Sequence, residues 1–145
     1  MSEQVTGHEP ETIVVVDDQP IVLEFCQVTL ERAGYTVFTA TSAAQALTFF
    51  EPHRTPVDLA IVDIVMPGMS GIELAKQLEE LNTRIVLMSG YSPDEVRRVV
   101  GDDASPFRSM WKPFEAATLV QMTKNALDTP LPERAVGGRA FAAGR

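Results

Sequence analysis

The residues best suited to chemistry stand where short apolar runs end. Asp17 and Asp18 follow the run "TIVVV", and Asp63 ends the run "VDLAIVD". Ser89 lies near the end of "RIVLMSG", and Lys112 closes "FRSMWK". A carboxylate buried without a partner is strongly unfavourable, so Asp63 does not fit the middle of an apolar core. A strand that delivers Asp63 to the edge of a sheet would instead make this carboxylate available for a reaction.

The types of these five residues indicate phosphoryl transfer to a carboxylate. Clustered carboxylates repel one another and need a cation among them, and oxygen ligands with open positions suit Mg²⁺. Lys112 supplies a compact positive charge, and the hydroxyl of Ser89 can donate a hydrogen bond to an oxygen. An aspartate, a divalent metal ion, a lysine and a hydroxyl form a site for this transfer. A Ser-His-Asp site does not compete, because His8 and His53 lie in a loose terminus and a predicted loop.

The elements that must position these residues alternate between strands and helices. Apolar, β-branched runs predict strands at 12–18, 35–40, 57–63, 84–90 and 107–112. Helical spacing follows each strand: from Pro20 to Gly34, after Ser42, after Ser70, after Ser92, and after Pro113 to about Leu127. Ser42 with Gln45, and Ser70 with Glu73, are spaced as capping boxes. Five such units predict an α/β fold with a parallel sheet, in which ligands bind beyond the carboxyl ends of the strands.

Length and composition place these elements in one domain. The chain has 145 residues, of which 45% are hydrophobic and 22% are charged, as in globular proteins. We expect flexible segments at 1–11 and 128–145 around a folded body at 12–127. The net charge of −8 argues against nonspecific nucleic-acid binding, and no apolar run is long enough to span a membrane. The single cysteine, Cys26, and the absence of a signal peptide favour the cytoplasm, and Cys26 is expected to be a small buried hydrophobe.

Four motifs give the chain its resemblance to a known family. They are "VVDDQP", "VDIVMPGMSG", "LMSGYS" and "MWKPF", and each stands at the end of a predicted strand. With these motifs the chain resembles the response regulator receiver domain of two-component signal transduction over residues 12–127. The resemblance implies a flavodoxin-like (βα)5 fold, a doubly wound parallel sheet with strand order 2-1-3-4-5. Residues 128–145 are too few for a DNA-binding output domain, so we expect a stand-alone, single-domain type.

The resemblance also implies roles for the acidic residues. Asp63 resembles the phosphoacceptor of the family. Asp18 and Asp63 would ligate Mg²⁺ through their side chains, with Asp17 nearby and acting through water. The backbone carbonyl of Val65 would complete the protein ligands.

Three further residues take their expected roles from the same resemblance. Ser89 would bind the phosphoryl group and shift when it arrives. Lys112 would pair with Asp63 and later with the phosphate. Pro113 would follow Lys112 through a cis peptide bond.

The sequence departs from the family pattern at two positions. Gln19 stands where many receivers have another acidic residue. Ser109 stands three residues before Lys112, where the family often has a Tyr or Phe that swings inward on activation. Trp111 and Phe107 share the strand parity of Ser109 and could replace that aromatic, but the favoured interpretation is a tryptophan fixed in the core.

The leading hypothesis is a phosphoacceptor switch, which assists its own phosphorylation and dephosphorylation rather than acting as an enzyme. The phosphoryl group would come from a histidine kinase or a histidine phosphotransfer protein. The output would be contact with a downstream protein target or phosphate transfer, by a monomer or weak dimer that binds neither nucleic acid nor membrane.

Three alternatives compete with this hypothesis. The chain could be the terminal receiver of a hybrid histidine kinase expressed alone, although Met1 and the unstructured flanks favour a complete protein. An aspartyl-nucleophile phosphatase of the haloacid-dehalogenase type would need an acidic residue at the position of Val65. A nucleotide-binding module would need a glycine-rich phosphate loop, and neither G-x-G-x-x-G nor G-x-x-x-x-G-K-[ST] occurs.

Overall fold

The computed structural model describes residues 9–102, 104 and 107–131 and contains a five-stranded parallel sheet. The strand order is β2-β1-β3-β4-β5, as the family resemblance implies. The strands are β1 (Thr12–Val16), β2 (Thr36–Ala40), β3 (Leu59–Asp63), β4 (Arg84–Ser89) and β5 (Arg108–Trp111). The helices are α1 (Pro20–Arg32), α2 (Ala43–Leu47), α3 (Gly71–Glu80), α4 (Pro93–Val100) and α5 (Ala116–Asp128), with a 3₁₀ turn, η1 (Thr48–Phe50), after α2.

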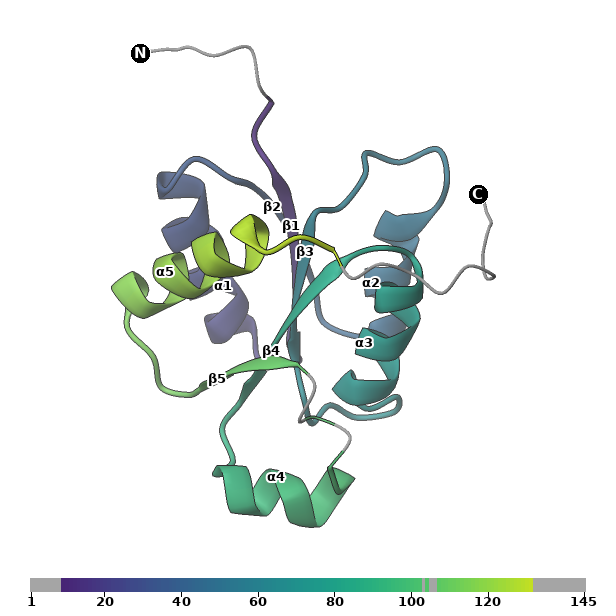
Figure 1. Ribbon diagram of the computed structural model, residues 1–145, viewed down its shortest axis with the longest axis vertical. Coiled ribbons are helices and arrows are strands. Elements are labelled where there is room, and N and C mark those ends of the chain that lie inside the picture. Colours follow the sequence, from purple (N-terminus) through teal and green to yellow (C-terminus); the bar gives the residue numbers. More distant parts are fainter. Residues whose placement is uncertain (1–8, 103, 105–106, 132–145) are drawn as a thin grey trace.

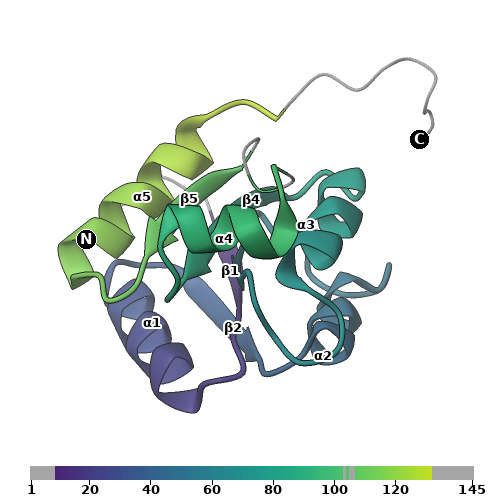
Figure 2. The same cartoon turned by 90° about the horizontal axis from the view of Figure 1, so that it is seen from below.

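Helices cover both faces of this sheet. Helices α1 and α5 lie on one face, and α2 and α3 lie on the other, as Figures 1 and 2 show from two directions. Helix α4 lies below the sheet in Figure 1, and its Val96 joins the core on the face covered by α2 and α3. All residues of β1 and β3 are buried, as expected for central strands covered on both faces. Strands β2 and β5 form the two edges and alternate between buried and more exposed residues.

Two cores, one on each face of the sheet, hold the layers together. The core under α1 and α5 contains Leu30, Ile61 and Leu119, which have no exposed surface. The core under α2 and α3 contains Val62, Leu74 and Leu78, which are equally inaccessible. Residues of β3 thus point alternately into the two cores. This double anchoring fixes the end of β3, where Asp63 lies.

Local signals account for most helix starts. Ser70 and Glu73 form the predicted capping box of α3, and Ser92 forms one with Glu95 at α4. At α2 only half of the predicted box is present. The Ser42 hydroxyl accepts the Gln45 N–H at 3.1 Å, but the Gln45 side chain accepts the backbone N–H of Thr41 instead of that of Ser42.

The boundaries agree closely with the sequence-based expectation. Helix α5 ends at Asp128, one residue beyond the predicted end, and the Thr129 carbonyl accepts a 2.7 Å hydrogen bond from Nε of Arg84. The predicted flexible segments at 1–11 and 128–145 lie mostly outside the described residues and stay predictions. None of the helices in the described part of the chain combines the length and hydrophobicity needed to cross a bilayer.

Candidate functional site

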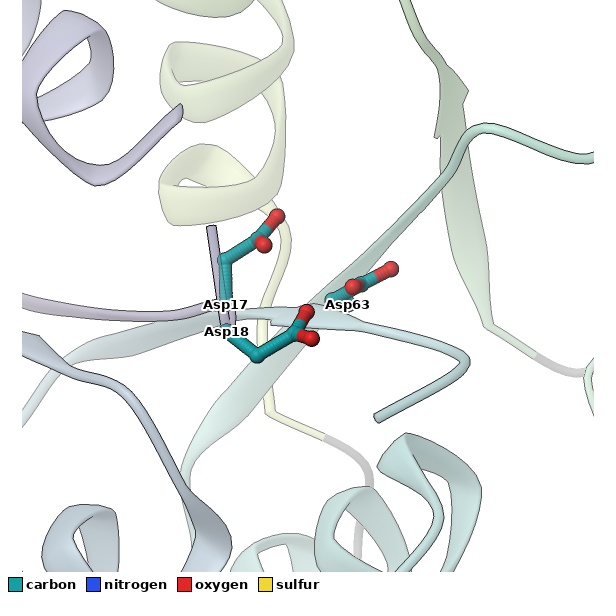
Figure 3. Close-up of side chains that lie close together, drawn as sticks. All are labelled: Asp17, Asp18 and Asp63. Atoms are coloured by element: carbon teal, nitrogen blue, oxygen red, sulfur yellow. The ribbon is translucent and has the colours of Figure 1, made fainter. Parts of the chain in front are cut away.

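Three carboxylates meet at the carboxyl edge of the sheet. Asp17 and Asp18 directly follow β1, and Asp63 ends the neighbouring strand β3, where Val62 is in register with Val16. The three side chains lie together in Figure 3, and one carboxylate oxygen from each lies within 4.8 Å of the others. Asp17 and Asp63 are buried, with 0% and 6% of their surface exposed, whereas Asp18 is exposed. The edge therefore concentrates negative charge, with Asp17 and Asp63 largely shielded from water and Asp18 open to it.

The lysine expected at this edge joins the cluster from the last strand. Lys112 directly follows β5, and its Nζ lies 2.7 Å from Oδ2 of Asp17 and 3.7 Å from Oδ2 of Asp63. The expected pair of Lys112 with Asp63 is thus present, but the shorter ion pair is with Asp17. The Lys112–Pro113 peptide bond is cis, as the family resemblance implies.

The environment makes the carboxyl group of Asp63 a weaker acid than an ordinary aspartate. Burial is the largest cause of the change, and the charges of Asp17 and Asp18 add to it. Lys112 and the N–H of Val65 act in the opposite direction, and the net effect raises the pKa of Asp63 to about 6. The excess negative charge that raises this pKa also attracts a cation.

A magnesium ion fits this set of donors. The cluster offers hard carboxylate oxygens from Asp17, Asp18 and Asp63, and Asp18 keeps the site open to water and to phosphate oxygens. Val65 lines the same cleft and could add its carbonyl oxygen. A bound Mg²⁺ would offset the repulsion among the carboxylates and would supply positive charge for an incoming phosphoryl group.

Ser89 reaches the same edge at the end of β4, but its hydroxyl is engaged locally. It accepts the Tyr91 N–H at 2.9 Å and donates to the Tyr91 carbonyl at 3.4 Å. The backbone of Ser89 is also tied to β5, because its carbonyl accepts the Lys112 N–H at 2.7 Å. The hydroxyl would have to give up its donation to the Tyr91 carbonyl before it could donate to a phosphoryl group near Asp63.

An open cleft of about 500 Å³ is lined by Asp18, Asp63 and Lys112 of this cluster. Its lining also includes four residues for which no role was predicted from the sequence, namely Met66, Pro67, Gly90 and Tyr91. The signal for them was present, since all four belong to the quoted motifs "VDIVMPGMSG" and "LMSGYS". The loops that follow β3 and β4 therefore form the walls of the site.

Trp111 is not fixed in the core, so the favoured expectation for this residue is wrong. Its side chain is 39% exposed, although Met110 on the opposite face of β5 is buried in the core under α1 and α5. Strand parity places Ser109 and Trp111 on the face of β5 toward α4. There they line a hollow of about 210 Å³ together with Phe107 and residues of α4. Trp111 stays exposed because β5 is an edge strand and the short side chain of Ser109 does not fill the hollow between β5 and α4.

Two residues outside the site behave as predicted. Cys26 is fully buried, and its burial and the charge of Asp17 raise the pKa of the thiol to about 12, so it is an unreactive core residue. His53 is solvated, with 75% of its side chain exposed. His8 lies outside the described residues.

A doubly wound parallel sheet with an acidic cluster and a lysine at its carboxyl edge defines a receiver domain. The chain belongs to the response regulator receiver domain family, whose model matches residues 13–124. It is 32% identical over 139 residues to the response regulator GtcR of Aneurinibacillus migulanus, covering 92% of this chain and 57% of that protein. The chain spans about half the length of the curated relatives it matches.

Solved structures show the same relationship. A CheY-like receiver domain protein from Methanospirillum hungatei JF-1 is 28% identical with a TM-score of 0.71, over 82% of this chain and 94% of that chain. The response regulator TrrA from Thermotoga maritima, in complex with Mg²⁺-BeF, is 31% identical with a TM-score of 0.68, over 80% of this chain and 98% of that chain. The predicted fold and family are therefore confirmed.

Proposed function

We propose that this receiver domain accepts a phosphoryl group on Asp63 in a Mg²⁺-dependent reaction. The convergence of Asp63 with Asp17, Asp18 and Lys112 at one sheet edge carries the proposal. One carboxylate oxygen of Asp63 attacks the phosphorus atom of the donor, and the bond between phosphorus and the donor's leaving group breaks. The product is an acyl phosphate on Asp63.

The other side chains prepare the site for this transfer. Asp18, Asp63 and the carbonyl of Val65 would hold Mg²⁺, with Asp17 next to them. Lys112 would meet the oxygens of the phosphoryl group, and the distance of 3.7 Å between its Nζ and Oδ2 of Asp63 supports this role. Ser89 becomes a second donor when its hydroxyl turns away from Tyr91. The same groups would assist hydrolysis of the acyl phosphate, so the protein is a self-assisting switch rather than an enzyme acting on other substrates.

The proposed donor is a histidine kinase or a histidine phosphotransfer protein, the classes with which receiver domains interact. A groove of about 500 Å³ adjoins the cleft and shares Gln19 and Lys112 with it. Its other lining is apolar and includes Ile21, which is 76% exposed, and Phe25. A donor helix with an apolar face, seated in this groove, would hold its phosphohistidine next to Asp63.

The proposed output is a contact with a downstream protein or onward transfer of the phosphate, by a monomer or weak dimer. The net charge of −8 favours protein contact over DNA binding. The buried single cysteine suits the reducing cytoplasm, where we propose that the protein acts. The same site would serve a receiver within a hybrid kinase.

Mass spectrometry after incubation with acetyl phosphate and Mg²⁺ tests the central reaction without a partner protein. The wild-type protein should gain one phosphoryl group, an increase of about 80 Da, in a covalent step. Asp63→Asn keeps the shape of the side chain but removes the nucleophilic carboxylate, so the adduct should disappear. A full adduct on the Asp63→Asn protein would overturn the assignment, and so would a wild-type protein that gains nothing.

A further inference from the structure

Gly71, the first residue of α3, lies directly against the backbone that carries Asp63. Its N–H donates to the Ile64 carbonyl at 2.9 Å. A Cβ at this position would lie 2.8 Å from the carbonyl carbon of Asp63 and 2.9 Å from Cα of Ile64, and closer still to the Asp63 carbonyl oxygen. The backbone of Gly71 is not in the left-handed region, so the need for glycine here is steric rather than conformational.

Neither partner in this contact can move away easily. Helix α3 is anchored by its buried side chains Ile72, Leu74 and Leu78, and its start is fixed by the Ser70–Glu73 capping box. On the other side, β3 is bonded to both β1 and β4, and all its residues are buried. An added methyl group would therefore be accommodated where the structure is least constrained, at the end of β3 and in the loop between β3 and α3.

That loop belongs to the phosphorylation site. It carries Val65, whose N–H hydrogen-bonds to the carboxylate of Asp63 and which lines the cleft. The loop leaves β3 at Asp63 and returns at Gly71, where the Gly71–Ile64 hydrogen bond closes it. The position of Val65 relative to the Asp63 carboxylate thus depends on how closely α3 approaches β3.

We propose that Gly71 is a positioning residue for the phosphorylation site. Because Gly71 has no side chain, the start of α3 can pack directly on the backbone of Asp63. This close packing determines the positions of the Asp63 carboxylate and the Val65 carbonyl. This inference rests on the proposed function, because it takes Asp63 as the acceptor. Gly71 acts through these two residues and does not itself touch a phosphoryl group.

The test compares Gly71→Ala with a matched glycine substitution far from the site. Gly34 follows α1, has a φ of +103°, and a Cβ there would meet nothing within 4 Å. Gly34→Ala should therefore lower the melting temperature through backbone strain without touching the cleft. Three quantities are measured for each protein: the melting temperature, the Mg²⁺ affinity from Trp111 fluorescence, and the rate of adduct formation with acetyl phosphate.

We expect Gly71→Ala to lower both the Mg²⁺ affinity and the phosphorylation rate by about 10- to 100-fold, as misplacement of reacting groups by about 1 Å can do. Gly34→Ala should leave both quantities at the wild-type level, even if its melting temperature falls further. Wild-type affinity and rate in Gly71→Ala would overturn the inference. Equal losses in the two variants would also overturn it, because stability alone would then explain them.

A background with higher stability keeps the test decisive if Gly71→Ala folds poorly. The hydroxyl of Thr123 is buried and has no hydrogen-bond partner within the described part of the chain. Thr123→Val should therefore raise the melting temperature without touching the cleft. If Gly71→Ala is unfolded even in this background, the contact supports the whole fold rather than the site, and the inference is wrong. Failure of the wild-type protein to form an adduct would instead refute the proposed function.

Discussion

Lys112 is held more closely by Asp17 than by the proposed phosphoacceptor. Its Nζ lies 2.7 Å from Oδ2 of Asp17 and 3.7 Å from Oδ2 of Asp63. Asp17 is fully buried, and its other oxygen accepts the Gln19 N–H at 2.8 Å. Asp17 therefore acts as a fixed anchor that aims the lysine across the cleft. Asp17 and Asp63 share the ammonium group of Lys112, so a substitution of Asp17 or of Lys112 changes the charge around Asp63.

This shared lysine predicts opposite effects of two substitutions on the pKa of Asp63. Asp17→Asn should lower that pKa, because the charge of Asp17 is one of the causes that raise it. Lys112→Ala should raise it further, because the lysine favours the ionised carboxylate. Carboxyl ¹³C NMR titration of the metal-free protein measures both, with Asp63→Asn to assign the signal. Shifts in the same direction in the two variants would contradict the prediction.

The raised pKa of Asp63 also predicts how stability depends on pH in the absence of Mg²⁺. The carboxyl group has a pKa of about 4 in the unfolded chain, and the fold raises this pKa to about 6. Between these values the folded protein binds more protons than the unfolded chain. The contribution of Asp63 to the free energy of unfolding therefore falls as the pH rises through this window and stays low above it.

Removal of this charge should stabilise the metal-free protein. At pH 7, Asp63→Asn should increase the free energy of unfolding by about 1–3 kcal/mol relative to the wild type. The gap should close at pH 4, and saturating Mg²⁺ should reduce it by stabilising the folded wild type. Urea unfolding at the two pH values, with and without Mg²⁺, measures these differences. A gap of the same size at pH 4 would point to a cause other than ionisation.

The proposed Mg²⁺ ligands predict unequal effects at two neighbouring positions. Asp18→Ala removes a carboxylate of the cluster and should weaken Mg²⁺ binding by at least about tenfold. Gln19 also lines the cleft, but Gln19→Ala removes no charge. This control variant should therefore change the Mg²⁺ affinity much less. The fluorescence of Trp111, the sole tryptophan and the neighbour of Lys112, reports the titration. Equal affinities for the two variants would count against Asp18 as a ligand.

The site cluster could be predicted from sequence because topology alone brings it together. Strands of a parallel sheet end at the same edge, so Asp17, Asp63 and Lys112 had to converge once five strand–helix units were recognised. Burial of Cys26 was expected from the small, apolar character of its side chain within the first helix pattern, and the structure confirms it. These outcomes depend on periodicity and connection order, which are visible along the chain.

Details that depend on distances between elements could not be predicted in this way. The spacing of Asp17 and Lys112 reflects how β1 and β5 sit relative to each other across two intervening strands. The exposure of Trp111 reflects the unfilled hollow between α4 and β5. From the sequence, Gly71 is only the last residue of the motif "VDIVMPGMSG", and its contact with the backbone of Asp63 depends on how α3 packs against β3.

The apolar groove beside the cleft predicts a variant that separates protein donors from small ones. Ile21→Asp places a charge on a side chain that is 76% exposed, so it should hardly affect folding. It should slow phosphotransfer from a phosphorylated histidine phosphotransfer protein by about tenfold or more, since an apolar contact is lost. The rate with phosphoramidate, a small donor that needs no groove, should stay unchanged. A loss with both donors would place the defect in the site instead.

The hollow next to Ser109 predicts how the switch responds to phosphorylation. A phosphoryl group on Asp63 should draw the Ser89 hydroxyl away from Tyr91, and Ser89 is in register with Trp111 on β5. We expect Trp111, which is partly exposed and lines the hollow of about 210 Å³, to rotate inward when Ser89 moves. A cavity of about 150 Å³ can accept a benzene ring, so the hollow has room for part of the indole.

Because no large side chain at Ser109 locks the change, the shift between the two states should be partial. Amide spectra with and without beryllofluoride should place the peaks of residues 89–100 and 107–111 between two end states, and the exposure of Trp111 to a fluorescence quencher should fall. Trp111→Ala should leave the Mg²⁺-dependent adduct intact but reduce the spectral shift. Ser109→Tyr fills the hollow and should block the inward movement of Trp111. Complete conversion of the wild type to one new state, with Trp111 still accessible to quencher, would assign the switch to another residue.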